Sequence, residues 1–199
     1  MKKTIIFILM ICFVLGFSAC EHKLVMPKKD AESVNKDAGK VMSFDWPYFS
    51  TAEELTEKAS DVYTGTVTDI SFDVIDLKTG KTACKDLAEA EYPMLCVIYT
   101  IETEDYYKGS QREVVQLKTE GGWAGFKDDE QRAVLDDFEN IEKDRVYFEA
   151  DQFDRLSVGE TYVFCTQSLA GGPDYIYNPN QFAFQIDSAN AKAVLACVK

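Results

Sequence analysis

The segment "DVYTGTVTDISFDVID", residues 61–76, decides the class of fold. Most of its residues are β-branched, aromatic or otherwise apolar, and it contains no proline, a composition that predicts one long β-strand. Gly65 lies inside this strand, where a glycine indicates a bend or a close approach of another backbone. The chain is therefore expected to be built around β-structure.

Further strands and two helices are predicted on either side of this strand. The later strands are expected at residues 94–107, 112–122, 145–150, 156–169 (after a turn at Gly159) and 182–186. Two overlapping capping boxes predict a short helix over residues 52–60. Their members are Ser50 with Glu53 and Thr51 with Glu54. A C-terminal helix is expected in residues 187–198, capped by Asp187 or Ser188.

Residues 127–143 are acidic and leave two interpretations open. Val134, Leu135 and Phe138 fit a helical stripe, but a stripe this brief does not decide between helix and loop. Elsewhere strands follow one another without alternating helices, a pattern that favours antiparallel pairing. The sequence thus predicts a mainly β fold: a five- to six-stranded antiparallel, OB-like barrel with a short N-terminal helix and a C-terminal helix.

Several segments between residues 52 and 186 carry a resemblance to a known group of domains. They are "ELTEKASDVYTGTV", "VIYTIETEDYYKG", "VVQLKTEGG", "LSVGETYVFC" and "FAFQI". Together they resemble extracytoplasmic bacterial domains with an OB-like, TIMP/netrin-type barrel. The resemblance implies a fold rather than an activity. The animal modules carry a cysteine framework at the start of the domain that this chain lacks, so no metalloprotease inhibition is implied.

The first twenty residues have the pattern of an export signal. Lys2 and Lys3 precede an apolar run from Ile5 to Phe17. As a helix this run reaches about 20 Å, which is too short for a hydrocarbon core of about 30 Å. Residues 1–19 are therefore predicted to be a signal peptide and not a membrane span.

The end of this segment, Phe17-Ser18-Ala19-Cys20, resembles the bacterial lipobox. In lipobox proteins the cysteine sulfur receives a diacylglyceryl group and becomes the first mature residue. The resemblance implies a bacterial lipoprotein anchored through Cys20 to the extracytoplasmic face of the cell membrane; the alternative is an ordinary secretory signal. Residues 20–43, rich in Lys, Asp and Ala, predict a flexible tether, and residues 44–199 predict the folded domain.

Four cysteines remain after Cys12 and Cys20 are set aside. An even number in an exported domain is typical of disulfides. The pairs expected are Cys84–Cys96, closing a local loop, and Cys165–Cys197, holding the C-terminal segment to a strand. Free buried thiols are the alternative. No C-x-x-C spacing occurs, so neither a zinc ribbon nor a thioredoxin-type site is predicted.

The acidic charge balance excludes one class of partner. The formal net charge is −13, and loss of residues 1–19, which hold two lysines and no acid, changes it to −15. Because a domain with this negative charge repels the phosphate backbones of nucleic acids, no nucleic-acid binding is expected.

The distribution of catalytic residue types argues against an enzyme. The only histidine, His22, lies on the predicted tether, so the domain is not expected to hold a Ser-His-Asp triad, a Cys-His pair or a His-ligated zinc ion. Paired carboxylates are available at residues 128–130, 136–137, Asp151 and Asp154, and a glycosidase needs two of them about 5–10 Å apart. Acids this numerous form such pairs by chance. No enzymatic activity, metal or cofactor is predicted.

Aromatic residues in two loops are the better candidates for function. Trp123 and Phe126 lie in the glycine-rich "GGWAGF" loop, and Tyr175 and Tyr177 lie in "AGGPDYIYNPNQ". Flat rings suit stacking on sugars or peptides, and barrels of this kind bind ligands with their loops. The sequence predicts a non-enzymatic module that binds a protein, a peptide or a neutral glycan. The alternatives are a carboxylate-dependent hydrolase and a structural envelope component without a ligand, in which these rings belong to the core.

Overall fold

The computed structural model describes residues 22–25, 40–41, 46–83, 92–123, 125–138, 146–147 and 155–198. Its elements in chain order are β1 (Lys40–Val41), α2 (Ala52–Lys58), β2 (Asp61–Asp76), β3 (Lys81–Thr82), β4 (Pro93–Lys108), β5 (Val114–Glu120), α3 (Asp128–Asp136), β6 (Val146–Tyr147), β7 (Thr161–Thr166), β8 (Ala183–Gln185) and α4 (Ala189–Val198). The short strands β1 and β6 pair in parallel with each other.

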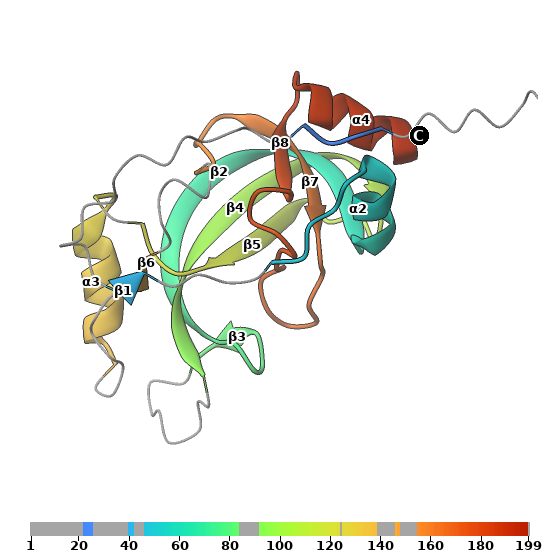
Figure 1. The fold of residues 1–199 in the computed structure, drawn as a ribbon. Helices are drawn as coiled ribbons and strands as arrows, with labels where there is room; N and C mark the ends of the chain where they lie inside the picture. The colour runs from blue at the N-terminus through green and yellow to red at the C-terminus, as the bar shows by residue number, and fades with distance from the viewer. Residues whose placement is uncertain are drawn as a thin grey trace, which may run out of the picture.

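The centre of the fold is a six-stranded antiparallel sheet (Figure 1). Five strands follow the order β5-β4-β2-β7-β8, and β3 pairs with the end of β2. A mainly β, antiparallel fold is therefore confirmed, and the long strand predicted at residues 61–76 is β2 itself.

The expected closure into a barrel is wrong, because the sheet is open. Among the described strands β5 pairs only with β4, and β8 pairs only with β7. The outer edge of β5 is occupied instead by Asp174, whose backbone N–H donates to Gln116 O at 2.7 Å and whose carbonyl accepts from Lys118 N–H at 2.8 Å. With three residues, β8 is also too short to offer a full ladder.

The bend that Gly65 predicts is present in β2. The register between β2 and β4 shifts on both sides of this region, between Tyr63 and Gly65 and again between Val67 and Asp69. A Cβ atom on Gly65 would lie 2.7 Å from the backbone carbonyl oxygen of Glu102. Glycine therefore lets two strands approach where any side chain would force them apart.

Two hydrophobic clusters lie on the two faces of the sheet. Neighbouring residues of β2 point to opposite faces, so that Tyr63 enters one cluster and Val62 the other. The larger cluster joins the sheet to α3 through Leu135 and Phe138. The smaller one packs the sheet against α2 and α4, through residues such as Leu55.

Helices α2 and α4 begin where a side chain satisfies one of their first N–H groups. At α2, Thr51 is the cap: its Oγ1 accepts from Glu54 N–H at 3.2 Å, whereas the Glu54 carboxylate accepts from Ser50 N–H at 2.9 Å and not from Thr51. At α4, Ser188 Oγ accepts from Ala191 N–H at 3.1 Å, so Ser188 and not Asp187 supplies the cap. The ambiguous segment 127–143 contains α3, with Leu135 buried.

The first described residues depart from the predicted tether. His22 O accepts from Ala52 N–H at 2.9 Å, and Leu24 N–H donates to Ser50 O at 3.3 Å. Leu24 is buried in the cluster beneath α2 and α4. Residues 22–25 are therefore part of the folded body, because Leu24 gains burial there that a solvated linker would not give it.

The predicted signal peptide, Cys20 and residues 26–39 of the tether lie outside the described residues. Within the part of the chain that is described, no helix is both long enough and apolar enough to cross a bilayer.

Candidate ligand-binding site

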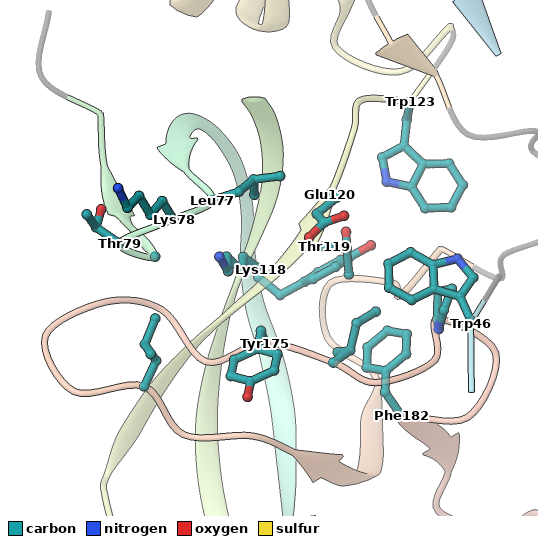
Figure 2. Close-up of a pocket in the computed structure, with 15 residues that line it drawn as sticks. Trp46, Leu77, Lys78, Thr79, Lys118, Thr119, Glu120, Trp123, Tyr175 and Phe182 are labelled. Carbon is teal, nitrogen blue, oxygen red and sulfur yellow. The ribbon is translucent and has the colours of Figure 1, made fainter. Parts of the chain in front are cut away.

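A cavity of about 340 Å³ opens beside the end of β5 (Figure 2). Its walls come from several parts of the chain: Tyr99 in β4, the end of β5 and the loop after it, the turn between β2 and β3, the loop that follows β7, and Trp46 before α2. The lining residues are Trp46, Leu77, Lys78, Thr79, Gly80, Tyr99, Lys118, Thr119, Glu120, Trp123, Leu169, Tyr175, Ile176, Pro179 and Phe182.

Helix α3 fixes the loop that carries Trp123. The side chain of Gln131 is fully buried. Its Oε1 accepts from Trp123 N–H at 3.1 Å, and its Nε2 donates to the carbonyl oxygens of Trp123 and Phe126 at 2.7 and 2.5 Å. Three backbone groups of an irregular loop are thus satisfied by one amide, which places the indole without a strand or helix around it.

A buried ion pair fixes the opposite wall. Arg112, in the connection between β4 and β5, donates from both terminal nitrogens to the carboxylate of Asp174, at 2.8 and 2.6 Å. Asp174 is 1 % exposed. The next residue, Tyr175, exchanges two backbone hydrogen bonds of 2.9 Å with Gln167. The Tyr175 ring therefore reaches the cavity from a segment that is tied to both β5 and the end of β7.

The cavity has an aromatic end and a charged side. Figure 2 shows the rings of Trp46, Trp123 and Phe182 at one end, with Lys118 and Glu120 at the end of β5. Flat rings offer stacking surfaces, whereas the ammonium and carboxylate groups provide hydrogen-bonding partners. A ligand with a flat apolar face and polar edges matches this arrangement.

Burial alters the acid–base behaviour of two lining residues. It raises the pKa of the Glu120 carboxyl, an effect that the positive charge of Lys118 opposes. It also raises the pKa of Tyr99, so that this hydroxyl keeps its proton at neutral pH. The cavity therefore holds a tyrosine O–H and a carboxyl group beside a cation, all capable of directional contacts with a polar ligand.

Two of the four aromatic residues singled out in the sequence line the cavity, and two do not. Trp123 and Tyr175 face it. Phe126 packs against Phe72, with ring centroids 6.3 Å apart, and carries the Arg155 guanidinium at 3.9 Å from its ring centroid. Tyr177 packs against Phe49 at 6.0 Å. All four rings lie in glycine-containing loops. This sequence context does not distinguish the rings that line the cavity from those that pack in the core.

Several lining residues were missed because they lie outside the two loops, on predicted strands or in the stretch before the first helix. They include Trp46, Lys118, Glu120 and Phe182. Trp46 belongs to the aromatic stretch "FDWPYF", which in the sequence marks only the start of the domain. Lys118 is 6 % exposed. A lysine within a strand predicts a solvated position, so no local signal indicates that it enters a cavity.

The cysteines do not form the expected disulfide in the described part of the chain. Cys96, Cys165 and Cys197 are free thiols, and Cys84 lies outside the described residues. Cys165 and Cys197 do meet in one hydrophobic cluster. In this structure Cys197 donates from Sγ to Ala193 O at 3.2 Å on its own helix and Cys165 is buried, so both are free thiols, and the pairing between them stays a prediction.

The assumption that His22 stands apart from the domain is wrong. Its Nδ1 lies 2.7 Å from Glu53 Oε1, at the start of α2. Glu53 is in turn close to Cys197 at the end of α4. The acidic residues around α3 do not line the cavity, and Asp151 and Asp154 are outside the described residues.

Comparison with known proteins assigns no family to the chain. No protein-family model matches it, and no curated protein matches its sequence. Its function is therefore inferred from the residues of the cavity.

Proposed function

We propose that this chain is a lipid-anchored extracytoplasmic protein whose folded domain binds a small neutral ligand without transforming it. The observation that carries the binding role is the cavity between Trp46, Trp123 and Tyr175. Two indoles and a phenol from three separate segments meet at one depression, and each lies where a ring-shaped ligand can stack.

The size and charge of the cavity narrow the ligand class. At about 340 Å³ it lies at the small end of ligand sites, so it suits a short ligand segment. The charged lining residues are two lysines, Lys78 and Lys118, and one acid, Glu120, so opposite charges compensate one another in part. One sugar ring or two of a neutral glycan, with apolar ring faces and hydroxyl edges, combines the stacking and hydrogen bonding on offer. The aromatic side chain of a peptide is the next best match.

Anchoring is supported by the sequence pattern that ends at Cys20. If it is correct, metabolic labelling with a palmitate analogue depends on that residue: Cys20→Ala removes both the label and the membrane association. A labelled Cys20→Ala variant, or an unlabelled native chain, contradicts the anchor.

The binding role is tested with defined neutral oligosaccharides and short aromatic peptides, titrated by calorimetry. We expect Trp123→Ala and Tyr175→Ala to weaken binding about 5- to 150-fold, since loss of an aromatic contact costs on the order of 1–3 kcal/mol. The matched control is Tyr92→Ala, because the Tyr92 ring is 65 % exposed and lies outside this cavity. Equal affinity in all three variants overturns the proposal.

The competing hypothesis, a hydrolase that uses two carboxylates, makes a different prediction. The hydrolase hypothesis requires that the native protein cleaves the same oligosaccharides and that Glu120→Gln abolishes this cleavage. The binding hypothesis predicts that the oligosaccharide is recovered intact. Turnover by the native protein that is lost in Glu120→Gln replaces the binding role with an enzymatic one.

A further inference from the structure

A second group of chemically active side chains lies on the other side of the sheet from the large core. His22, Glu53 and Cys197 each direct one donor atom to a common point, and these atoms all lie within 4.8 Å of one another. His22 Nδ1 and Glu53 Oε1 are the closest pair, at 2.7 Å. An imidazole nitrogen, a carboxylate oxygen and a thiol sulfur form the ligand set that zinc accepts in proteins.

The spacing of the three atoms is close to that of a metal site. In tetrahedral zinc coordination, bonds of about 2.0–2.3 Å place neighbouring ligand atoms roughly 3.3–3.8 Å apart. The His22–Glu53 contact needs to open by about 0.6 Å on that basis, and the other distances need to close by at most about 1.5 Å. Rotation of exposed side chains provides such shifts: His22 is 37 % exposed and Glu53 44 % exposed.

One carboxylate oxygen of the cluster lacks a hydrogen-bond partner among the described residues. Glu53 Oε2 is buried and has no hydrogen-bond partner among the described residues, although Oε1 is engaged by both the backbone and the ring of His22. The carboxylate as a whole is 44 % exposed, and a cation is one way to satisfy this oxygen.

The three ligands come from segments that the fold brings together for other reasons. His22 belongs to the N-terminal segment, Glu53 to the first turn of α2 and Cys197 to the last turn of α4. Figure 1 shows α2 and α4 packed side by side, with residues 22–25 running beside α4. The packing of Leu24 and Leu55 in the shared cluster positions the polar groups above it.

The cluster is open to solvent. A surface depression is lined by all three residues together with Thr56, Glu57, Lys108, Ala196 and Val198. Lys108, which lines this depression, is engaged elsewhere, because its Nζ donates to the carbonyl oxygens of Thr56 and Glu57 at 2.7 and 3.0 Å. An ion can therefore enter from water and retain a water molecule as a fourth ligand.

We propose that His22, Glu53 and Cys197 bind one divalent transition-metal ion of the zinc class and thereby fasten the N-terminal segment to the two helices. Calcium and magnesium prefer sites made of oxygen atoms, and copper(I) prefers sulfur-rich ones. A mixed nitrogen, oxygen and sulfur set selects zinc, with cobalt(II) as its spectroscopic substitute. This inference is independent of the aromatic cavity.

The test is a titration of the full-length chain, in detergent and under reducing conditions, with cobalt(II) followed by displacement with zinc. We expect one equivalent to bind, with a thiolate-to-cobalt charge-transfer band and the absorption of tetrahedral cobalt. His22→Ala, Glu53→Gln and Cys197→Ser should each weaken binding about tenfold or more. Glu57→Gln is the matched control, because this acid lines the same depression without belonging to the ligand set.

A second measurement guards against binding elsewhere. Bound zinc should slow alkylation of Cys197, measured by peptide mass spectrometry, and this protection should disappear in His22→Ala. Binding without the thiolate band, equal affinities across the four variants, or unprotected Cys197 at saturating zinc each overturn the proposal.

Discussion

Arg112 is the residue whose loss should damage both the fold and the cavity wall. Its guanidinium binds Asp174 through two hydrogen bonds and lies 3.4 Å from the carboxylate of Asp61. It also donates to the Tyr106 hydroxyl at 3.2 Å. Asp61 and Asp174 are 3 % and 1 % exposed, so a single cation serves two buried acids. We consider Arg112→Met, which keeps much of the side-chain volume.

The expected cost follows from what remains after the substitution. Removing one partner of a buried ion pair typically costs about 3–5 kcal/mol, because the other charge stays buried without compensation. Arg112 itself is 34 % exposed, so water screens part of the interaction and we take the lower end, about 3 kcal/mol. When Asp174→Asn is added to Arg112→Met, the double variant should recover part of this loss. The coupling free energy between the two residues should be about 2 kcal/mol.

The assay is urea unfolding of the four proteins of this cycle, followed by tryptophan fluorescence. Arg112→Met should lower the unfolding midpoint without changing the slope of the free energy against urea concentration. The double variant should lose less unfolding free energy than the two single variants lose in sum. A cost below about 1 kcal/mol, or a coupling below about 0.5 kcal/mol, would refute the assignment of Arg112 as the compensating charge.

Three further changes test other parts of the structure. Gly65→Ala should cost about 1–3 kcal/mol in urea unfolding, because the new Cβ meets the backbone of β4; an unchanged midpoint would contradict the close approach. Gln131→Ala should cost about 2–4 kcal/mol and alter the Trp123 emission, since three loop hydrogen bonds are lost together; unaltered emission would show that Gln131 does not hold the loop. For Glu120, burial raises the folded-state pKa above the ordinary value of 4.5, so its contribution to stability is present below about pH 4.5 and is lost as the pH rises through the folded pKa. Glu120→Gln should therefore be more stable than the native protein at about pH 7 and lose that advantage near pH 4, and the reverse order would contradict this sign.

Local patterns were sufficient for the strands and helix caps but not for the way they assemble. The composition of residues 61–76 predicts β2 because strand propensity depends on the segment itself, and the pair Thr51 and Glu54 predicts the start of α2 for the same reason. The open sheet depends instead on Asp174 occupying the edge of β5. A single buried aspartate in a loop has no pattern that predicts such a contact.

The residues of the cavity also fall into those that local sequence patterns predict and those that they do not. Trp123 and Tyr175 could be predicted from loops that present aromatic rings, whereas Trp46 becomes a neighbour of these rings only through tertiary packing. His22 is the clearest case. The polar composition around it predicts a solvated linker, and only the burial of Leu24 two residues later brings the imidazole to Glu53.

If Cys20 carries the proposed lipid, the docking of residues 22–25 sets how far the folded body can stand from the membrane. With a lipid on Cys20, only Glu21 lies between the anchored residue and His22, and two extended residue steps reach about 7 Å. The domain would then rest with its α2–α4 end against the headgroups in one preferred orientation. A long flexible tether would instead allow many orientations. Anything it binds would have to come within a few nanometres of the bilayer surface.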